Sequence, residues 1–220
     1  MDTAYFQEII RYIAMGAGVT LQVFAVTLVF SIPIGVICAI GKLSRFRVIR
    51  FLLSVYTWIF RGTPLLLQLF FTYYGLPILT NGLIALEPLP AALLTFVFNY
   101  AAYFTEIFRA GIQSIGRGQY EAAKALGMPH WLMMRRIILP QAVKIILPPM
   151  GNEAINLIKD TALCSVITVT EILRNASRVM SRDFNITALV IAACIYLALT
   201  FVVILLFRQL EKRFAYYSIK

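Results

Sequence analysis

Three polar side chains lie within one long apolar run of the chain, where an ionisable group is energetically costly and its presence requires an explanation. Glu153, Asn156 and Asp160 fall within about 60° of one another on a helix, at about 100° per residue. Ionisable groups inside a membrane span are costly, so each is a functional hypothesis by default. A carboxylate there would attract a guanidinium or ammonium group through charge-assisted hydrogen bonds. The three residues are therefore candidate ligands for a polar solute.

Further polar residues stand in the two apolar runs that come before this one. Arg61 precedes a Gly-Thr-Pro break, and Pro64 removes a backbone donor and frees carbonyls that must find partners or line a cavity. Asn99 and Tyr103 share one helical face. We expect Arg61, Asn99 and Tyr103 to join the binding candidates. Arg61 could equally reach the membrane surface, if residues 48 to 60 lie at the interface.

Structural roles are the alternative for other buried charges. Glu106 shares the face of Tyr103, and we expect it to pair with Arg109 or to stabilise a dimer. Lys159 projects about 100° away from Asp160 and could join it in a buried ion network that fixes helix packing. Asp160 therefore has two open interpretations, one as a ligand and one as part of this network.

The composition places these residues in a membrane protein. Of 220 residues, 60% are hydrophobic and 14% are charged, with a mean hydropathy of +0.82, which is far more apolar than ordinary globular usage. The start of the chain has acidic Asp2 and Glu8 before Arg11, so we expect the first apolar run to be a retained helix. A span needs about 20 apolar residues. Five spans account for the pattern, at about residues 16 to 41, 52 to 79, 88 to 110, 144 to 170 and 186 to 207.

Basic residues predict the orientation of these spans. Lys and Arg gather between the first and second spans, between the third and fourth, and after Phe207, where Lys220 is the last of them. The positive-inside rule makes these three segments cytoplasmic, with the N-terminus outside and the C-terminus inside. The external segment 171 to 183 weakens the rule because it contains three arginines. The net charge of +10 is thus explained by orientation, and we expect no nucleic-acid partner.

The largest cytoplasmic segment contains the stretch GQYEAAKALGMPHW, residues 118 to 131. Its helix formers predict about two helical turns, with Glu121 in the first turn, where the helix dipole favours an acid. Gly127 can adopt positive φ and end the helix, and Pro129 cannot continue it. A helix this short is marginal in water, so it must rest on lipid headgroups or on another protein. Its alanines permit close backbone approach and favour a protein.

The stretch EAAKALGMPHWLMMRRIILP resembles the EAA loop of ATP-binding-cassette importer permeases. RGTPLLLQLFFTYYGLP at 61 to 77, AYFTEIFRAGIQSIGRGQ at 102 to 119 and LIKDTAL at 157 to 163 are similar to the polar amino-acid branch of that superfamily. The resemblance implies a type I importer permease fold, all-α with five transmembrane helices in a single domain, 1 to 220. It makes residues 111 to 143 the cytoplasmic coupling loop. The implied ATPase-coupling residues are Glu121, Ala122, Ala123, Lys124, Leu126 and Gly127.

The resemblance also implies the partners and the solute. It implies separate ATPase subunits, an extracytoplasmic amino-acid-binding protein and a second permease subunit, identical or different, in a bacterial inner membrane. An acid at Glu153 looks like the histidine and arginine systems. We expect a basic amino acid, with glutamine or another polar amino acid next. A carboxylate there could equally hold the α-ammonium group that every amino acid carries.

Features that do not depend on this resemblance limit the chemistry that the chain can perform. The chain has no G-x-x-x-x-G-K-[ST] phosphate loop, because its only Gly-Lys pair, Gly41-Lys42, is followed by Leu43. If ATP drives transport, a partner chain binds it, and we expect no cofactor, metal site or covalent catalysis here. The alternative class is an autonomous channel or ion-coupled carrier, which the intramembrane charges would also suit. Such a carrier would have no use for a coupling loop.

Overall fold

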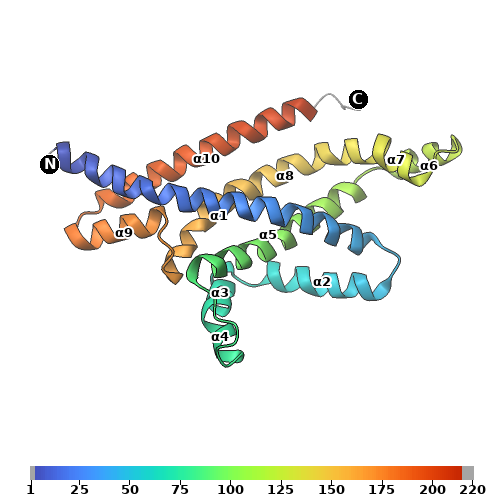
Figure 1. Ribbon diagram of the computed structural model, residues 1–220. Helices are drawn as coiled ribbons and strands as arrows, with labels where there is room; N and C mark the ends of the chain where they lie inside the picture. Colours follow the sequence, from blue (N-terminus) through green and yellow to red (C-terminus); the bar gives the residue numbers. More distant parts are fainter. Residues whose placement is uncertain (1–2, 215–220) are drawn as a thin grey trace.

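The computed structural model describes residues 3–214, in which every regular element is a helix (Figure 1). Asp2 and Lys220 lie outside the described residues. The all-α class predicted from the sequence is confirmed for this range. The elements are α1 Thr3–Leu43, α2 Arg47–Gly62, α3 Leu65–Phe70, the π-helical η1 Phe71–Gly75, α4 Leu76–Leu79, α5 Pro88–Gln113, α6 Arg117–Ala125, α7 His130–Met133, the π-helical η2 Met134–Ile138, α8 Leu139–Asp160, the 3₁₀ segment η3 Thr161–Ile167, α9 Ile172–Asp183 and α10 Thr187–Phe214.

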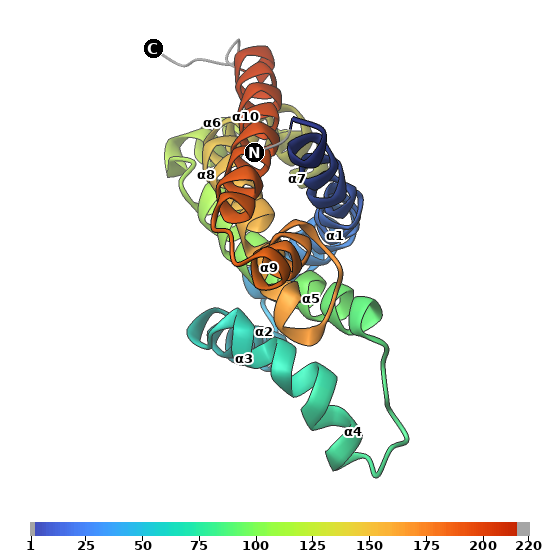
Figure 2. The same cartoon turned by 90° about the vertical axis from the view of Figure 1, so that its left-hand side faces the viewer.

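The long helices α1, α5, α8 and α10 run along the length of an elongated molecule, and α3 and α4 project from its side (Figures 1 and 2). α1 packs along α5 more extensively than along any other element. At Gly35 an added Cβ would lie 2.8 Å from the Cβ of Phe104, so the two helices approach closely. Small residues at helix contacts permit this approach and let dispersion forces hold helices together in lipid.

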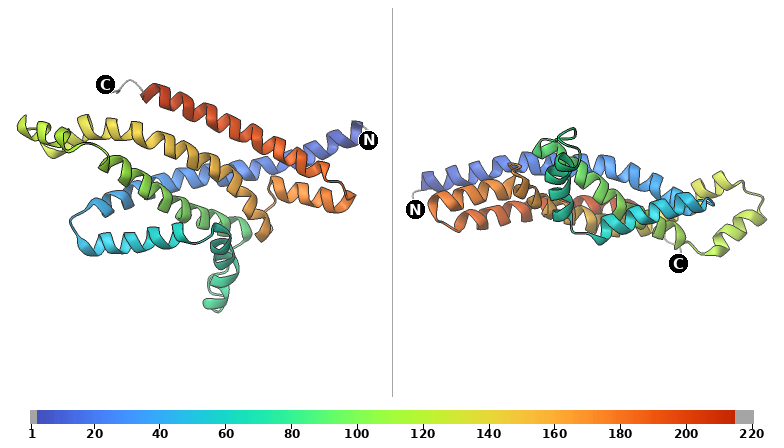
Figure 3. Two further views of the ribbon diagram at one scale, coloured as in Figure 1. Left: turned by 180° about the vertical axis from the view of Figure 1, so that it is seen from behind. Right: turned by 90° about the horizontal axis from the view of Figure 1, so that it is seen from below.

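The three basic segments gather at one end of the molecule. The α1–α2 turn, the α6–η2 region and the last turns of α10 all lie opposite the end that carries α9 and the start of α1 (Figure 3). Arg47, Arg136 and Arg213 mark the three segments in the sequence. The positive-inside rule expects segments on one side of a membrane to lie at the same end of the molecule, as these do although they are far apart in the chain.

The break predicted at Gly62 to Pro64, within the second span of residues 52 to 79, is confirmed. α2 begins at Arg47 and ends at Gly62, and the chain restarts at Leu65 as a shorter apolar helical stretch that reaches Leu79. Pro64 cannot donate to the carbonyl four residues before it, so the helix breaks there.

The other predicted spans change mainly at their ends. α1 starts 13 residues before the predicted boundary, because Ile9 and Ile13 are buried against α9 and α10. α8 begins at Leu139 and gives way to a 3₁₀ segment that ends before Thr168, a residue with positive φ. α5 and α10 agree with the predicted spans, although α10 continues to Phe214. Within residues 3–214, three helices are long and apolar enough to cross a membrane: α1, α5 and α10.

The segment expected to be an external loop, residues 171 to 183, is also a helix. Glu171 caps α9, accepting hydrogen bonds from the backbone N–H of Leu173 at 2.8 Å and of Arg174 at 2.6 Å. Its carboxylate also accepts from Tyr196 Oη at 2.5 Å, which ties α9 to α10. The side chain is fully buried. Tertiary packing therefore orders a segment that its arginines made look solvated.

Gly16 is the point at which α1 touches the backbone at the start of α9. A Cβ at this position would lie 2.5 Å from the carbonyl carbon of Glu171 and 2.5 Å from the nitrogen of Ile172. Backbone atoms cannot move aside as a flexible side chain would. We predict that Gly16→Ala lowers the free energy of unfolding by about 1–3 kcal/mol, as overpacking does. The measurement is SDS-induced unfolding of the purified chain.

Gly18→Ala is the matched control on the same helix. Nothing lies within 4 Å of a Cβ built at Gly18, so this variant should keep the wild-type unfolding midpoint or raise it slightly through helix propensity. Equal destabilisation by both substitutions would contradict the proposed contact between α1 and α9.

Candidate functional site

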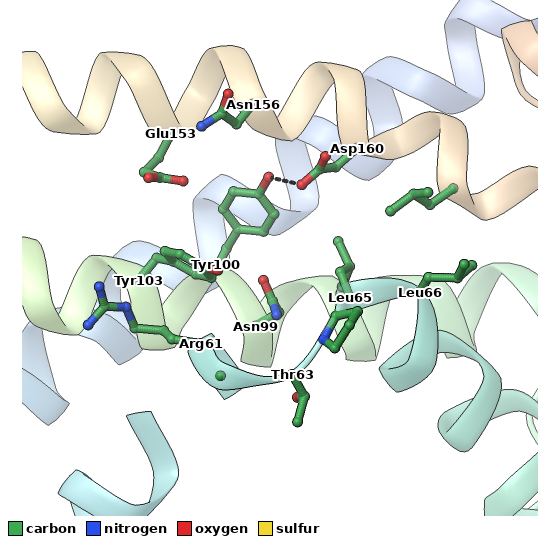
Figure 4. Close-up of a pocket in the computed structure, with 13 residues that line it drawn as sticks. Arg61, Thr63, Leu65, Leu66, Asn99, Tyr100, Tyr103, Glu153, Asn156 and Asp160 are labelled. Atoms are coloured by element: carbon green, nitrogen blue, oxygen red, sulfur yellow. Dashed lines mark hydrogen bonds between the residues drawn. The ribbon is translucent and has the colours of Figure 1, made fainter. Parts of the chain in front are cut away.

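A pocket of about 580 Å³ opens between the α2–α3 break, α5 and α8 (Figure 4). All six residues predicted as solute ligands line it, although they come from three apolar runs. They are Arg61, Asn99, Tyr103, Glu153, Asn156 and Asp160. Tyr100, Pro64 and the residues beside the break complete the lining.

The break at Pro64 brings α2 into the pocket wall and leaves a carbonyl to be satisfied. Phe60 O, the acceptor that a residue without N–H cannot serve, accepts from Gln68 Nε2 at 2.9 Å and from Asn99 Nδ2 at 3.1 Å. Gln68 Nε2 also reaches Thr63 Oγ1 at 2.8 Å, and Asn99 Nδ2 donates to Gln68 Oε1 at 2.9 Å. These amides replace the missing backbone donor. Asn99 thus stabilises the break as well as lining the pocket.

Asp160 is held by a residue that the sequence analysis missed. Tyr100 Oη donates to Asp160 Oδ2 at 2.8 Å, from the middle of α5 (Figure 4). Tyr100 is buried, with 2% of its surface exposed, and its ring stacks on Phe96. A helical wheel separates Tyr100 from Asn99 by about 100° and so removes it from the predicted face. The signal available in the sequence was its hydroxyl inside an apolar run, since a buried tyrosine usually has a partner.

The opposite side of the pocket carries a cation. The guanidinium of Arg61 lies over the ring of Tyr103, 5.4 Å from its centroid, which is a cation–π arrangement. Glu153 points from α8 into the pocket, toward Arg61 and Tyr103, whereas Asn156 stays close to α8 (Figure 4). Arg61 therefore faces the pocket with the ring of Tyr103 beneath its guanidinium and the carboxylate of Glu153 on the α8 side.

The remaining predicted charges lie elsewhere. Glu106 accepts from Arg109 Nε at 2.9 Å, as expected, and also binds Lys42 of α1. Lys42 Nζ donates to Thr57 Oγ1 at 2.8 Å, so this cluster joins α1, α2 and α5 outside the pocket. Among residues 3–214 Lys159 is exposed and forms no direct ion pair with Asp160, whose hydrogen-bond partner is Tyr100.

The pocket has the chemistry of a site for a charged, hydrogen-bonding solute. It presents two carboxylates, one guanidinium and amide groups within mainly apolar walls. No group of three or more His, Cys, Asp or Glu side chains that could hold a metal ion occurs in the described part of the chain. The side chains that line the pocket are suited to recognition through ion pairs and hydrogen bonds.

A second candidate region is α6, which contains most of the predicted coupling residues. Glu121, Ala122, Ala123 and Lys124 lie in the helix, Leu126 is its C-cap and Gly127 follows with φ of +68°. Gly127 N–H donates to Lys124 O at 2.9 Å and the next N–H to Ala123 O at 3.0 Å, the two bonds of a Schellman motif.

One detail of the predicted α6 is wrong. The helix begins at Arg117, so Glu121 lies in its second turn and no acid stands in the first. The reason is Gly116, which has extended backbone angles and starts the helix earlier than the polar stretch suggested. Leu126 and Trp131 are exposed by 79% and 70%, and Trp131 was not among the predicted coupling residues.

Comparison with known proteins identifies the class. A family model of the inner membrane component of binding-protein-dependent transport systems matches residues 31–216. The chain belongs to this family. The family description makes it the membrane component of a transport system, located in a bacterial inner membrane.

Relatives and a solved structure narrow the comparison. The chain is 38% identical over 209 residues to a putative glutamine transport system permease of Rickettsia bellii, covering 94% of this chain and 95% of the relative. It is 37% identical over 205 residues to the arginine transport system permease of Bacillus subtilis, covering 93% of each. A crystal structure of an amino acid ABC transporter with histidines superposes with a TM-score of 0.88, at 34% identity, over 97% of this chain and 99% of that one.

The two amides at the break make a double substitution informative. Gln68→Leu or Asn99→Leu alone leaves Phe60 O with one donor, so each should cost about 1 kcal/mol of unfolding free energy. The double variant leaves the carbonyl without a donor. We predict that its loss of unfolding free energy exceeds the sum of the two single losses by about 1–3 kcal/mol. The SDS unfolding midpoints of the four proteins measure this coupling.

Thr95→Val is the control for this cycle. Thr95 lies one turn before Asn99, is buried, and donates only to Ala91 O at 2.8 Å. Its removal should neither destabilise the chain comparably nor change the effect of Gln68→Leu. Strict additivity of the Gln68 and Asn99 losses would show that the two amides do not share Phe60 O.

Proposed function

We propose that this chain is the permease subunit of an ATP-driven amino-acid uptake system and that its solute is a basic amino acid. Histidine, arginine and lysine are the candidates, with glutamine or another polar amino acid next. The six ligands predicted from the sequence would contact the solute in the pocket. The observation that carries the proposal is the convergence of Arg61, Glu153 and Asp160 on one pocket.

Formal charge supports a cationic solute. Glu153 and Asp160 contribute two negative charges to the pocket and Arg61 one positive charge, which gives −1. A neutral amino acid carries one charge of each sign and leaves this sum unchanged, whereas a basic amino acid with a net charge of +1 cancels it. Uncompensated charge in an apolar surrounding is expensive. The pocket therefore favours a basic amino acid over a neutral one.

Each ligand has a distinct proposed role. Arg61 would pair with the α-carboxylate, because a guanidinium binds a carboxylate in bidentate fashion. Glu153 and Asn156 would bind the α-ammonium group or the side-chain cation, and Tyr103 would pack against the solute. Tyr100 would fix the rotamer of Asp160 and direct its second oxygen to the pocket. The relatives named for glutamine and arginine are about equally similar, so the support for a basic solute is the pocket itself.

The membrane arrangement is part of the proposal. We infer five spans in a single domain, with the N-terminus outside and the C-terminus cytoplasmic. α2 with α3 to α4 and the kinked α8 would supply the second and fourth spans. The gathering of the basic segments at one end of the molecule supports this orientation. An extracytoplasmic amino-acid-binding protein would deliver the solute at the opposite end, and a second permease subunit, identical or different, would complete the path.

α6 would couple the permease to separate ATPase subunits, which bind the ATP. Its exposed Leu126 and the residues from Glu121 to Gly127 would form the contact within the loop 111 to 143. Movement of α6 would reach α8 through η2, since η2 packs against both α6 and α8. α8 carries Glu153 and Asp160, so displacement at the ATPase could open or close the pocket. The autonomous channel or carrier is not favoured, because the family match is to a component of a multi-protein system.

Glu153→Gln tests the solute charge. Loss of a charge-assisted bond of about 1.5–3 kcal/mol should raise the arginine concentration for half-maximal uptake about ten- to hundredfold, and affect glutamine much less. The measurement is uptake by the reconstituted complex, with competition among arginine, histidine, glutamine and glutamate.

Glu87→Gln is the control for this variant. Glu87 is exposed and precedes α5 without a side-chain capping bond, so its loss should leave uptake unchanged. Unchanged arginine selectivity in Glu153→Gln would reject the basic-solute assignment. Loss of uptake for all four amino acids at unchanged binding would mean that Glu153 serves the transport cycle without recognising the solute charge.

Gly127→Ala tests the coupling loop. An L-residue in the left-handed region costs roughly 1–2 kcal/mol, so the end of α6 should loosen and association with the ATPase should weaken about five- to thirtyfold. Gly118→Ala is the control, because Gly118 has no neighbour within 4 Å and no positive φ. Co-purification and solute-stimulated ATP hydrolysis measure the effect. Equal behaviour of the two variants would reject the coupling role of this turn.

A further inference from the structure

A groove between α1 and α10 lies away from the polar pocket. It has a volume of about 510 Å³, and Phe24 and Leu28 form its α1 wall. Its α10 wall runs from Val203 through Leu206 to Arg213. We name this cavity the α1–α10 groove. None of its residues belongs to the solute pocket or to α6.

The polarity of the groove changes in one direction along α10. Its lining is apolar from Val203 to Phe207, and Gln209, Leu210 and the terminal cation Arg213 follow at the basic end of the helix. The step from Val203 to Arg213 is ten residues, or about 15 Å at about 1.5 Å per residue. That length is about half of a hydrocarbon core of about 30 Å. The groove therefore has the depth of one leaflet, with its cation at the headgroup level.

Packing behind the groove gives it a firm floor. The ring of Phe207 rests on α8 at Gly151, where an added Cβ would lie 3.1 Å from Phe207 Cδ1. Val203 is buried in the same cluster, with Ala154 and Ile158 of α8 beneath it. α10 is thus fixed to α8 at this level while its α1 side stays open.

The charges at the mouth of the groove are mostly positive. Among residues 3–214 Arg213 makes no ion pair, and Lys144 and Lys212 line an adjoining pocket of about 310 Å³ together with Glu211. The two pockets together therefore contain three cations and one acid. An anionic headgroup matches this excess, since Arg and Lys bind phosphate oxygens and each basic residue near a membrane surface adds about a further fivefold in affinity for anionic lipid.

We propose that the α1–α10 groove binds a phospholipid with an anionic headgroup. One acyl chain lies against Phe24, Leu28 and Leu206, and the phosphate binds Arg213 and Gln209. The lipid fills the opening between two helices that both belong to the membrane-spanning part of the chain. The inference is independent of the solute and requires only that α1 and α10 are in a bilayer.

The experiment uses the full chain purified from membranes and reconstituted in nanodiscs that contain phosphatidylcholine and phosphatidylglycerol. Native mass spectrometry after release from the disc measures each retained lipid. Arg213→Ala should lower retained phosphatidylglycerol about fivefold and leave phosphatidylcholine unchanged. Leu206→Trp fills the groove and should lower both lipids. Both side chains are exposed on α10, so folding is preserved.

Two controls separate the groove from general surface charge and hydrophobicity. Arg208→Ala removes a cation from the same end of α10, and Leu205→Trp enlarges an exposed residue, but neither residue lines the groove. Both controls should retain wild-type phosphatidylglycerol. An equal loss in Arg208→Ala, or no wild-type preference for phosphatidylglycerol, would overturn the proposal. So would disulfide cross-linking of Arg213→Cys between two copies, because a second chain would then occupy the groove.

Discussion

Lipid offers no hydrogen-bond partner, so a break in a membrane helix must be satisfied by the protein itself, and the arrangement around Pro64 depends on this constraint. The carbonyl of Phe60 has two amide donors, Gln68 from beyond the break and Asn99 from α5. The amides hold α2, α3 and α5 together at one point. A pocket can exist beside the break because its backbone groups already have partners.

The same requirement, that the protein itself must satisfy its buried polar groups, explains how the pocket can be polar while its surroundings are apolar. α8 contributes Glu153 and Asp160, α2 contributes Arg61, and each faces groups that compensate it. Tyr100 donates to Asp160, and the ring of Tyr103 attracts Arg61. Charges arranged in this way can stay in a membrane protein without being neutralised by one another, which is what the proposed role in solute binding requires.

The polar residues that line the pocket could be singled out from the sequence, whereas parts of the fold around them could not. The six ligand candidates could be found because ionisable and amide groups are costly in apolar runs and usually have a specific role there. Helical periodicity then placed them on common faces. Tyr100 was missed because periodicity describes one helix, whereas its partner is on another. The α2–α3 break could be predicted from Pro64, whereas the helix α9 was missed because burial of Glu171 orders a segment rich in arginine.

The sequence by itself determined that the chain is a helical membrane protein, which residues carry charge inside it, and which family it resembles, because composition, periodicity and motifs are local properties. Only the tertiary structure decided which charges meet. Glu106 forms ion pairs with Lys42 and Arg109, whereas Asp160 accepts a hydrogen bond from Tyr100. These choices depend on helix crossings and close contacts between residues far apart in the chain, and such contacts are set by packing across the whole bundle.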